Sequence, residues 1–345
     1  MPTVLESLNA ALHRALNDNR DVYLLGEDIL DPYGGAFKVT RGCSTRFPDR
    51  VLTTPVSEAG IVGVAAGMAL RGLRPVVEIM FGDFTTLIAD QLINHVAKLR
   101  WMYNDQVRLP LVIRTPMGGR RGYGPTHSQT LEKLYLGVPG LQVLAPAALS
   151  RPDGSGSPGD LLYQSILESD EPTLFIENKL LYYQLIQSQA DLSDFNIIVD
   201  PASQESGFPT YKLIMHGVPP AQLTITAYGY MAELARQAVT RLAYEHEIFT
   251  ELVVLTRLSP FNIAMIGISA SQTGALLTVE EGSLTLGWGA EVIARLAETQ
   301  NTPSIKYRRL AAIDLPIPAS GPLEAEVLPG IDHIIHAALE LTREQ

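Results

Sequence analysis

The sequence predicts an α/β protein with two doubly wound, mainly parallel-sheet domains. Its 345 residues are enough for two domains that each bury a core of their own. Strand-like and helix-like segments alternate from the N-terminus to residue 183, and a second alternation begins at residue 223. The residues between them show no clear periodicity. We therefore expect domains over 1–183 and 223–345, joined by an irregular linker over 184–222.

The spacing of apolar residues justifies the elements of the first domain. Apolar side chains at positions 4, 8, 12 and 16 share one face of a helix, and the apolar run at 22–25 is typical of a buried strand. The Ser- and Gly-rich residues 150–160 are expected to form a flexible insertion. The same criteria predict a helix after Ser57 that ends at 71–72, a strand at 74–79, a long helix at 85–100, and strands at 109–114, 141–144 and 173–176.

The second domain is predicted from the alternation of strand-like and helix-like segments that begins at residue 223. Its expected elements are a strand at 223–228, a helix at 230–245, strands at 251–256 and 275–279, a helix at 287–299, a strand at 305–309 and a final helix at 331–343.

Composition excludes several classes of function. Apolar residues make up 46% of the chain and charged residues 18%, which is typical of a soluble α/β protein. The net charge is −11 and no basic run is present, so neither nucleic acid nor a membrane is an expected partner. The first residues lack the pattern of a secretion signal. Cys43 is the only cysteine, which excludes intrachain disulfides. We expect a cytoplasmic protein.

The segment 53–84, TTPVSEAGIVGVAAGMALRGLRPVVEIMFGDF, places a carboxylate in an unusual position. Glu58 lies in the first turn of a helix that is otherwise apolar and rich in glycine. A carboxylate there is favoured by the helix dipole, so Glu58 has either this structural role or a functional one. Gly60, Gly63 and Gly67 lie on a face of the helix that would let another backbone, such as that of a second copy, come close.

This segment resembles the beta subunit of the thiamine-diphosphate-dependent first component of 2-oxoacid dehydrogenases, within the transketolase-like superfamily. The pyruvate, branched-chain and acetoin dehydrogenases belong to this group. The resemblance implies a pyrimidine-binding domain over 1–183 and a transketolase C-terminal-like domain over 223–345. It extends to LLGEDILDPYGGAFKVTRG at 24–42, THSQ at 126–129, GVPGLQVLAP at 137–146, VEEG and GWGAEVIARL within 279–296, and DLPIP at 314–318.

The resemblance also implies roles for individual residues. Glu58 would be the catalytic carboxylate that hydrogen-bonds the pyrimidine ring of the cofactor. Met80 and Phe84 would bind that ring, although ordinary core packing also accounts for both. His127 would handle a proton or bind the substrate carboxylate, and its alternative is a structural histidine. Glu27 could lie near the cofactor or cap the loop that follows it.

One motif of the superfamily is absent. The diphosphate and its metal ion are bound by a Gly-Asp-Gly segment that ends in Asn some thirty residues later, and this chain contains no Gly-Asp-Gly. We therefore expect no metal site here and predict an alpha-type subunit that shares the thiamine diphosphate, in an α2β2 assembly. The loop 168–171 also departs from the sequence with which relatives bind a monovalent cation, which leaves that site in doubt.

The expected reaction is the decarboxylation of a 2-oxo acid and transfer of the acyl unit to a lipoyl group, with a lipoyl acyltransferase as a possible further partner. Two alternatives stay open, the first of them motivated by divergence in the second domain and by altered loops. The acyl unit could be added to a second carbonyl, as in acyloin or transketolase chemistry. Alternatively, the chain could be a non-catalytic subunit that stabilises a partner.

Overall fold

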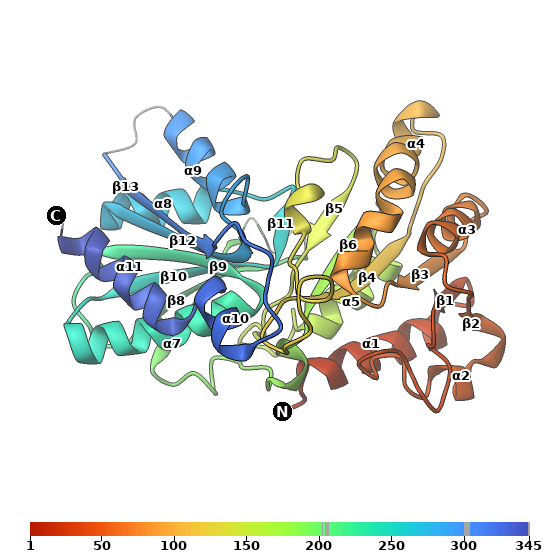
Figure 1. The fold of residues 1–345 in the computed structure, drawn as a ribbon, viewed down its shortest axis with the longest axis horizontal. Coiled ribbons are helices and arrows are strands. Elements are labelled where there is room, and N and C mark those ends of the chain that lie inside the picture. The colour runs from red at the N-terminus through yellow and green to blue at the C-terminus, as the bar shows by residue number, and fades with distance from the viewer. Residues whose placement is uncertain (202, 204–206, 300–303, 344–345) are drawn as a thin grey trace.

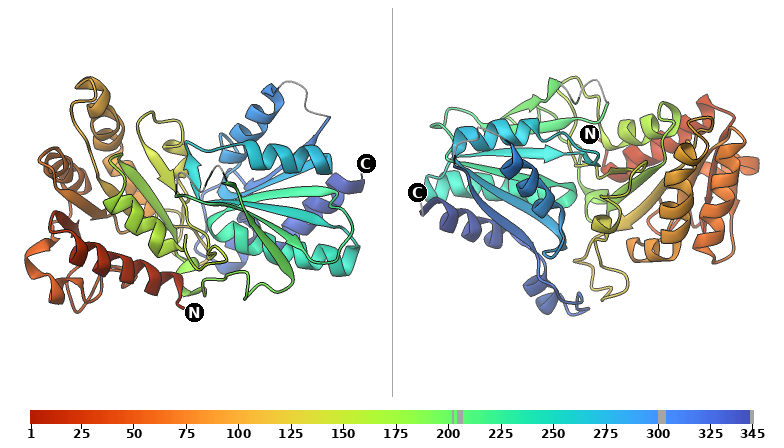
Figure 2. Two further views of the ribbon diagram at one scale, coloured as in Figure 1. Left: turned by 180° about the vertical axis from the view of Figure 1, so that it is seen from behind. Right: turned by 90° about the horizontal axis from the view of Figure 1, so that it is seen from above.

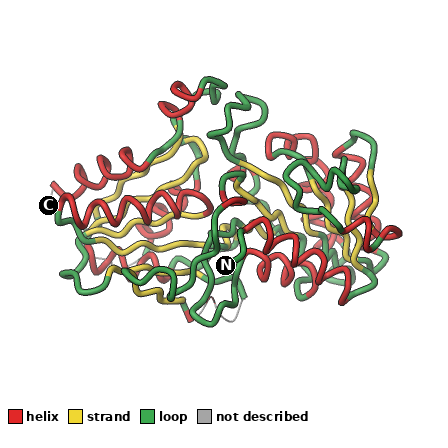
Figure 3. Tube along the Cα trace, turned by 90° about the horizontal axis from the view of Figure 1, so that it is seen from below, coloured by secondary structure: helices red, strands yellow, loops and turns green. Residues whose placement is uncertain are grey.

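The computed structural model describes residues 1–201, 203, 207–299 and 304–343. Two α/β domains lie side by side, with the N-terminal half on the right of Figure 1 and the C-terminal half on the left. In both domains helices lie on the two sides of the strands (Figures 2 and 3). The expected fold class is thus confirmed. The expectations for 184–222 and 223–345 include a few positions, 202, 204–206, 300–303 and 344–345, outside the described residues.

The first domain is built on a seven-stranded sheet. All of its strands run parallel except β11, which comes from the second half of the sequence and pairs antiparallel with β5. The order across the sheet is β11 (Arg257–Ser259), β5 (Gln142–Leu144), β6 (Thr173–Asn178), β4 (Val112–Met117), β3 (Arg74–Glu78), β1 (Val22–Gly26) and β2 (Val51–Thr53).

Helices cover both faces of this sheet. The helices α1 (Val4–Asp18) and α5 (Pro158–Leu167) pack together on one face. The helix α3 (Glu58–Leu70) packs on β3 at the other face. The remaining helical segments are α2 (Cys43–Arg46), η1 (Pro48–Arg50), η2 (Gly82–Ile88), η3 (Gln91–Val96), α4 (Ala97–Met102), η4 (Glu132–Leu134) and η5 (Leu181–Tyr183).

Two expectations for this domain need correction. The helix expected at 85–100 is not a regular α-helix, because η2 is a 3₁₀-helix and η3 widens into a π-helix before α4. Such helical turns depend on tertiary packing and cannot be predicted from the spacing of apolar residues. The flexible insertion expected at 150–160 contains the start of α5, at Pro158. Ser157 and Asp160 form a reciprocal capping box that starts α5.

The second domain is built on a six-stranded sheet. Its order is β13 (Lys306–Ala312), β12 (Ala275–Ser283), β9 (Leu223–Tyr228), β10 (Thr250–Leu255), β8 (Thr210–Met215) and β7 (Phe195–Val199). The two strands β7 and β8 pair antiparallel and extend the sheet over the range expected to be an irregular linker, so that expectation was wrong there. The helices are α7 (Gly229–His246), α8 (Ala264–Thr273), α9 (Trp288–Glu298), α10 (Gly321–Val327) and α11 (Ile331–Arg343).

The two domains share one hydrophobic core. A single cluster of buried side chains extends from Ile61 on α3 to Trp288 on α9. Trp288 is 1% exposed and its ring packs edge-on against Tyr228 of β9 at 5.2 Å. Because separating the domains would expose this apolar surface to water, their relative orientation is fixed by the core. Among the residues that the structure describes, no helix is long and apolar enough to cross a membrane.

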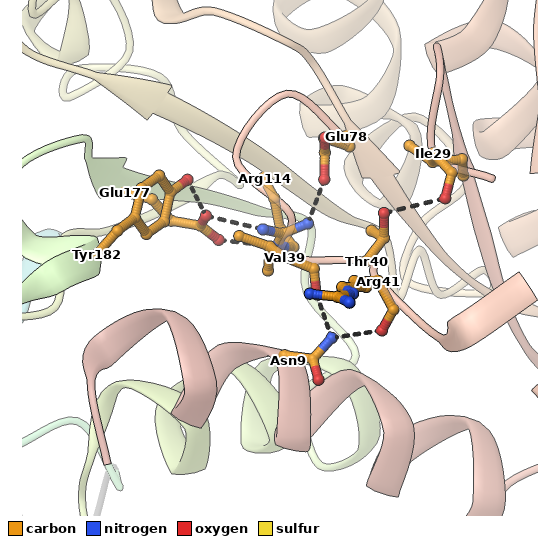
Figure 4. A network of polar contacts seen from close by, with 9 residues as sticks. All are labelled: Asn9, Ile29, Val39, Thr40, Arg41, Glu78, Arg114, Glu177 and Tyr182. Atoms are coloured by element: carbon orange, nitrogen blue, oxygen red, sulfur yellow. Dashed lines mark hydrogen bonds and ion pairs between the residues drawn. The ribbon is translucent and has the colours of Figure 1, made fainter. Parts of the chain in front are cut away.

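A buried ionic network joins the three central strands of the first sheet (Figure 4). The Arg114 guanidinium on β4 donates to Glu177 on β6 through Nε and Nη2, at 2.7 and 2.8 Å, and through Nη1 to Glu78 on β3 at 2.9 Å. Tyr182 donates its hydroxyl to Glu177 at 2.6 Å. All four side chains are buried. The network therefore holds these strands near the edge at which the candidate site lies.

Two buried carboxyl groups near the domain interface predict a pH-dependent stability. Glu280 accepts hydrogen bonds from the backbone N–H groups of Trp288 and Gly289 at 2.6 and 2.9 Å. Burial, and next the nearby carboxyl of Glu132, raise the pKa of Glu280 to about 7 from 4.5. The folded chain therefore retains a proton that the unfolded chain releases between pH 4.5 and 7.

The free energy of unfolding should thus fall as the pH rises from 5 to 8. Glu280 contributes about 2–3 kcal/mol to this fall, at 1.36 kcal/mol per pKa unit. Glu280→Gln should flatten the profile measured by urea denaturation at pH 5, 6, 7 and 8. Glu298→Gln, an exposed change at the end of α9, should leave it unchanged. A Glu280→Gln profile as steep as the parent's would contradict the assignment.

Candidate functional site

The predicted site residues lie where neighbouring parallel strands end. Gly26 of β1 is paired with Glu78 of β3, and Glu78 with Arg114 of β4, so the three strands reach the same edge together. Glu27 follows β1, the segment with Met80 and Phe84 follows β3, and the loop to His127 follows β4. Ligands in open α/β sheets bind outside the carboxyl ends of the strands. The topology therefore gathers the candidate residues at one edge.

Glu58 is a buried carboxylate without a partner in this arrangement. It is the first residue of α3 and 8% exposed, and no described residue donates a hydrogen bond to it. Ser57 occupies the N-cap position, but its side chain caps no N–H group. The helix α3 lies against η2, which carries Phe84. A dipole-stabilising glutamate would be just as stable in water, so burial at this edge favours the functional role.

Glu27 lies close enough to Glu58 for their charges to interact. Burial and the neighbouring Glu58 carboxylate raise the pKa of Glu27. Its Oε1 atom is buried and has no hydrogen-bonding partner among the described residues. Two carboxyl groups with unused hydrogen-bonding capacity thus face the same region. They can bind a ligand that presents nitrogen or hydroxyl donors.

An aromatic cluster surrounds His127. The imidazole ring lies edge-on to Phe81 at 4.8 Å and to Phe84 at 5.3 Å, measured between ring centroids. Phe81 also contacts Tyr123 at 5.9 Å. The Nδ1 atom of His127 is 3.0 Å from the Thr126 hydroxyl oxygen, which fixes the rotation of the ring. The structure therefore brings Phe84 and His127 together, as their predicted roles require.

Phe81 is a residue of this cluster that the sequence analysis missed. It follows β3 in extended backbone, with φ −143° and ψ 147°. The motif that singled out Met80 and Phe84 also contains Phe81, but a local pattern does not show which side chain faces the histidine. Met80 is half-buried, and its role in binding a pyrimidine ring stays a prediction.

A buried lysine completes the surroundings of His127. Lys179 is fully buried, its ammonium group lies 5.1 Å from the centroid of Phe81, and it donates a hydrogen bond to the His127 carbonyl oxygen. Burial lowers the pKa of Lys179 to about 8. Sequence reasoning did not find it, because the contact links residues 52 positions apart.

The described residues contain no group of three or more His, Cys, Asp or Glu side chains that could hold a metal ion. The loop before Pro172, in which a cation site was in doubt, is held by an arginine. The Arg74 guanidinium donates to the carbonyl oxygens of Ile166 and Ser169, both at 2.9 Å, and to the Asp170 carboxylate at 3.0 Å. A protein cation thus pairs with one carboxylate of this loop.

Both domains match models of known protein families. Residues 1–184 match the model of the transketolase pyrimidine-binding domain, and residues 217–334 match that of the transketolase C-terminal domain. The chain is 35% identical to the pyruvate dehydrogenase E1 component subunit beta-2, mitochondrial, of Oryza sativa subsp. japonica, over 97% of this chain and 85% of the relative. The chain belongs to the E1 beta-subunit family of the transketolase-like superfamily.

Other E1 beta subunits agree with this assignment. The mitochondrial pyruvate dehydrogenase E1 beta subunits of Drosophila melanogaster and Saccharomyces cerevisiae are 33% and 31% identical to the chain, each over 98% of it and 88% of the relative. Among solved structures, a split-gene transketolase described as an inactive beta4 tetramer superposes with a TM-score of 0.74, over 99% of both chains. At 20% identity, this likeness supports the fold alone.

Proposed function

We propose that this E1 beta-type chain is one subunit of a heteromeric thiamine-diphosphate enzyme. The enzyme would decarboxylate a 2-oxo acid and transfer the acyl unit to a lipoyl acceptor. One observation carries the proposal. A buried Glu58, to which no described residue donates a hydrogen bond, lies at the same sheet edge as an aromatic cluster around His127, in a chain that matches pyruvate dehydrogenase E1 beta subunits over nearly its full length.

The residues present fit the pyrimidine half of the cofactor. Glu58 and the orphaned Oε1 atom of Glu27 supply acceptors, and Phe81 and Phe84 supply an apolar wall. No acidic cluster among the described residues fits a metal–diphosphate group. When bound, thiamine diphosphate would supply the carbon nucleophile and the electron sink for loss of carbon dioxide. An alpha-type subunit would hold the diphosphate and Mg²⁺, in an α2β2 assembly.

The chain's own residues divide the remaining work. Glu58 would hold a proton-sharing hydrogen bond to a ring nitrogen, which orients the pyrimidine and changes its charge. Phe81 and Phe84 would exclude water from the reacting atoms. Among the described residues, the His127 ring has a hydrogen-bonding contact at Nδ1 only, which leaves Nε2 for the substrate carboxylate or for a proton. Imidazole can serve either purpose near neutral pH.

The surface of α3 supports the assembly. Gly60, Gly63 and Gly67 are exposed, and a Cβ atom added at Gly63 or Gly67 would meet nothing within 4 Å. Val64 on the same face is 60% exposed. We propose that this face packs against a second copy of the chain, because glycine lets two helix backbones approach closely.

The location of the enzyme is also a proposal. The relatives named above are mitochondrial proteins. We propose the cytoplasm for this chain, and its one cysteine, buried and free, is compatible with a reducing compartment. Fractionation of the source cells with an antibody against the chain tests this.

Calorimetric titration tests whether the cofactor site is divided between subunits. Thiamine diphosphate with Mg²⁺ is titrated into the purified chain alone, and then into the chain mixed with an alpha-type subunit of the same genome that carries the Gly-Asp-Gly motif. We expect binding at least ~100-fold weaker to the lone chain, because the diphosphate contacts are missing. Equally tight binding to both samples would overturn the two-subunit proposal.

A turnover assay then tests the reaction. The loaded complex is incubated with 2-oxo acids in three assays. The first contains an artificial electron acceptor, the second a lipoyl acceptor whose conversion to the dihydrolipoyl form is measured, and the third an aldehyde as the second carbonyl. Lipoyl acylation supports the proposal. Carbon–carbon bond formation without lipoyl acylation would favour a carboligating enzyme, and no turnover of any 2-oxo acid would favour a stabilising subunit.

A further inference from the structure

The loop between β4 and His127 has a backbone that turns its N–H groups towards one side. Gly118, Arg120 and Gly122 adopt positive φ angles of 97°, 66° and 68°. Left-handed residues that alternate with ordinary ones point successive N–H groups to a common side, which creates a small anion-binding hollow. Arg120 is the only one of these three without the conformational freedom of glycine, so something must hold it there.

Two carboxylates of the second domain occupy this hollow. The Gly119 N–H donates to Glu281 Oε1 at 2.6 Å. The Arg120 N–H donates to Glu324 Oε1 at 2.6 Å, and the Gly122 N–H to Glu324 Oε2 at 3.3 Å. Glu281 and Glu324 are 4% and 3% exposed. In the part of the chain that the structure describes, neither carboxylate forms an ion pair with Lys, Arg or His.

Side chains of both domains pack closely against the loop. A Cβ atom at Gly118 would lie 2.5 Å from Asn178 Nδ2, and one at Gly119 would lie 2.5 Å from Leu328 Cδ1. The Arg120 guanidinium donates to the carbonyl oxygen of Pro329, just after α10. The loop of the first domain is therefore pressed against the end of α10 in the second.

The other end of the loop is held as well, by Lys179 at the carbonyl oxygen of His127. Three buried charged side chains thus fix the loop through its backbone, at its start, its middle and its end. Hydrogen bonds between a backbone N–H and a charged carboxylate are roughly twice as strong as neutral ones. The loop held in this way places the side chain of His127 against Phe81 and Phe84.

We propose that Glu324, supported by Glu281, is a positioning residue. From the second domain, it fixes the conformation of the first domain's loop 118–127, which carries His127. Glu324 touches neither substrate nor cofactor in this assignment, and it acts on His127 through the amides of Arg120 and Gly122. The catalytic consequence rests on the proposed function, whereas the structural consequence does not. The sequence carries no sign of this link, since Glu324 is 204 residues from Arg120.

Hydrogen exchange on the full chain, followed by mass spectrometry, tests the structural part. Glu324→Ala should raise the exchange rate of the peptide spanning 118–127 by about tenfold or more, because its amides lose their acceptor. Glu324→Gln keeps one acceptor oxygen and the volume, so it should give an intermediate rise without disturbing the fold. Glu326→Ala, an exposed change on the same helix, should change nothing.

Kinetics of the complex with the alpha-type subunit and thiamine diphosphate test the catalytic part. Glu324→Gln should lower kcat by about tenfold while KM and cofactor affinity change less than about twofold, since only the placement of His127 is lost. Unchanged exchange in 118–127, or a kcat equal to that of Glu326→Ala, would overturn the proposal. A parent complex without any turnover would instead contradict the proposed function and leave the exchange result to decide the positioning role.

Discussion

Glu58→Gln should lower turnover of a 2-oxo acid by the complex at least ~100-fold, which is the range for losing a residue that moves or shares a proton in the reaction. The substitution keeps the size of the side chain and its place at the start of α3. It removes the charge that would make the hydrogen bond to the pyrimidine ring strong. Steady-state kinetics of the reconstituted complex measure the loss.

Two controls separate chemistry from folding. Cofactor affinity, measured by calorimetry, should fall far less than kcat, because the aromatic wall of Phe81 and Phe84 and the alpha-type subunit remain. Glu6→Gln changes an exposed carboxylate in the first turn of α1 and should leave kcat within twofold, as a cap costs only about 1 kcal/mol of stability. Turnover of Glu58→Gln within a few-fold of the parent would rule out the catalytic role.

The sequence predicted those parts of the fold that are set by local patterns. The helix with Glu58 in its first turn and the strand at Arg74–Glu78 follow from the spacing of apolar residues, and both are present. The strands β7 and β8 were missed. Their sequences, FNIIV and TYKLIM, are short apolar runs, and a short apolar run does not by itself show that a segment is a strand.

The site was predictable only where a short motif contains the residue. Glu58 and His127 stand in such motifs, and their neighbourhood at one sheet edge follows from the parallel topology. Phe81 was missed because the direction of its side chain depends on tertiary packing. Lys179 and Glu324 were missed because each acts on the backbone of a distant loop. A contact with a backbone amide or carbonyl leaves no pattern in the sequence of its partner.

Arg114→Met should lower the free energy of unfolding by about 3–5 kcal/mol, the usual cost of removing one partner of a buried ion pair. The substitution would leave Glu78 and Glu177 in the interior without their cation. Burial already raises the pKa of Glu78 in the parent chain, and Arg114 opposes that rise. Loss of the guanidinium would therefore raise the pKa of this carboxyl further.

The loss of stability in Arg114→Met should depend on pH. A carboxyl whose pKa in the folded chain lies above its unfolded value destabilises the fold as the pH rises through that range, so the loss should be larger at pH 8 than at pH 5. Urea denaturation at both pH values measures it, with the exposed Arg108→Met as the matched control. A loss below about 1 kcal/mol at pH 8 would show that the network is dispensable. A full loss would show that β3 and β4, the strands that lead to Met80 and to the His127 loop, depend on the buried Arg114 cation.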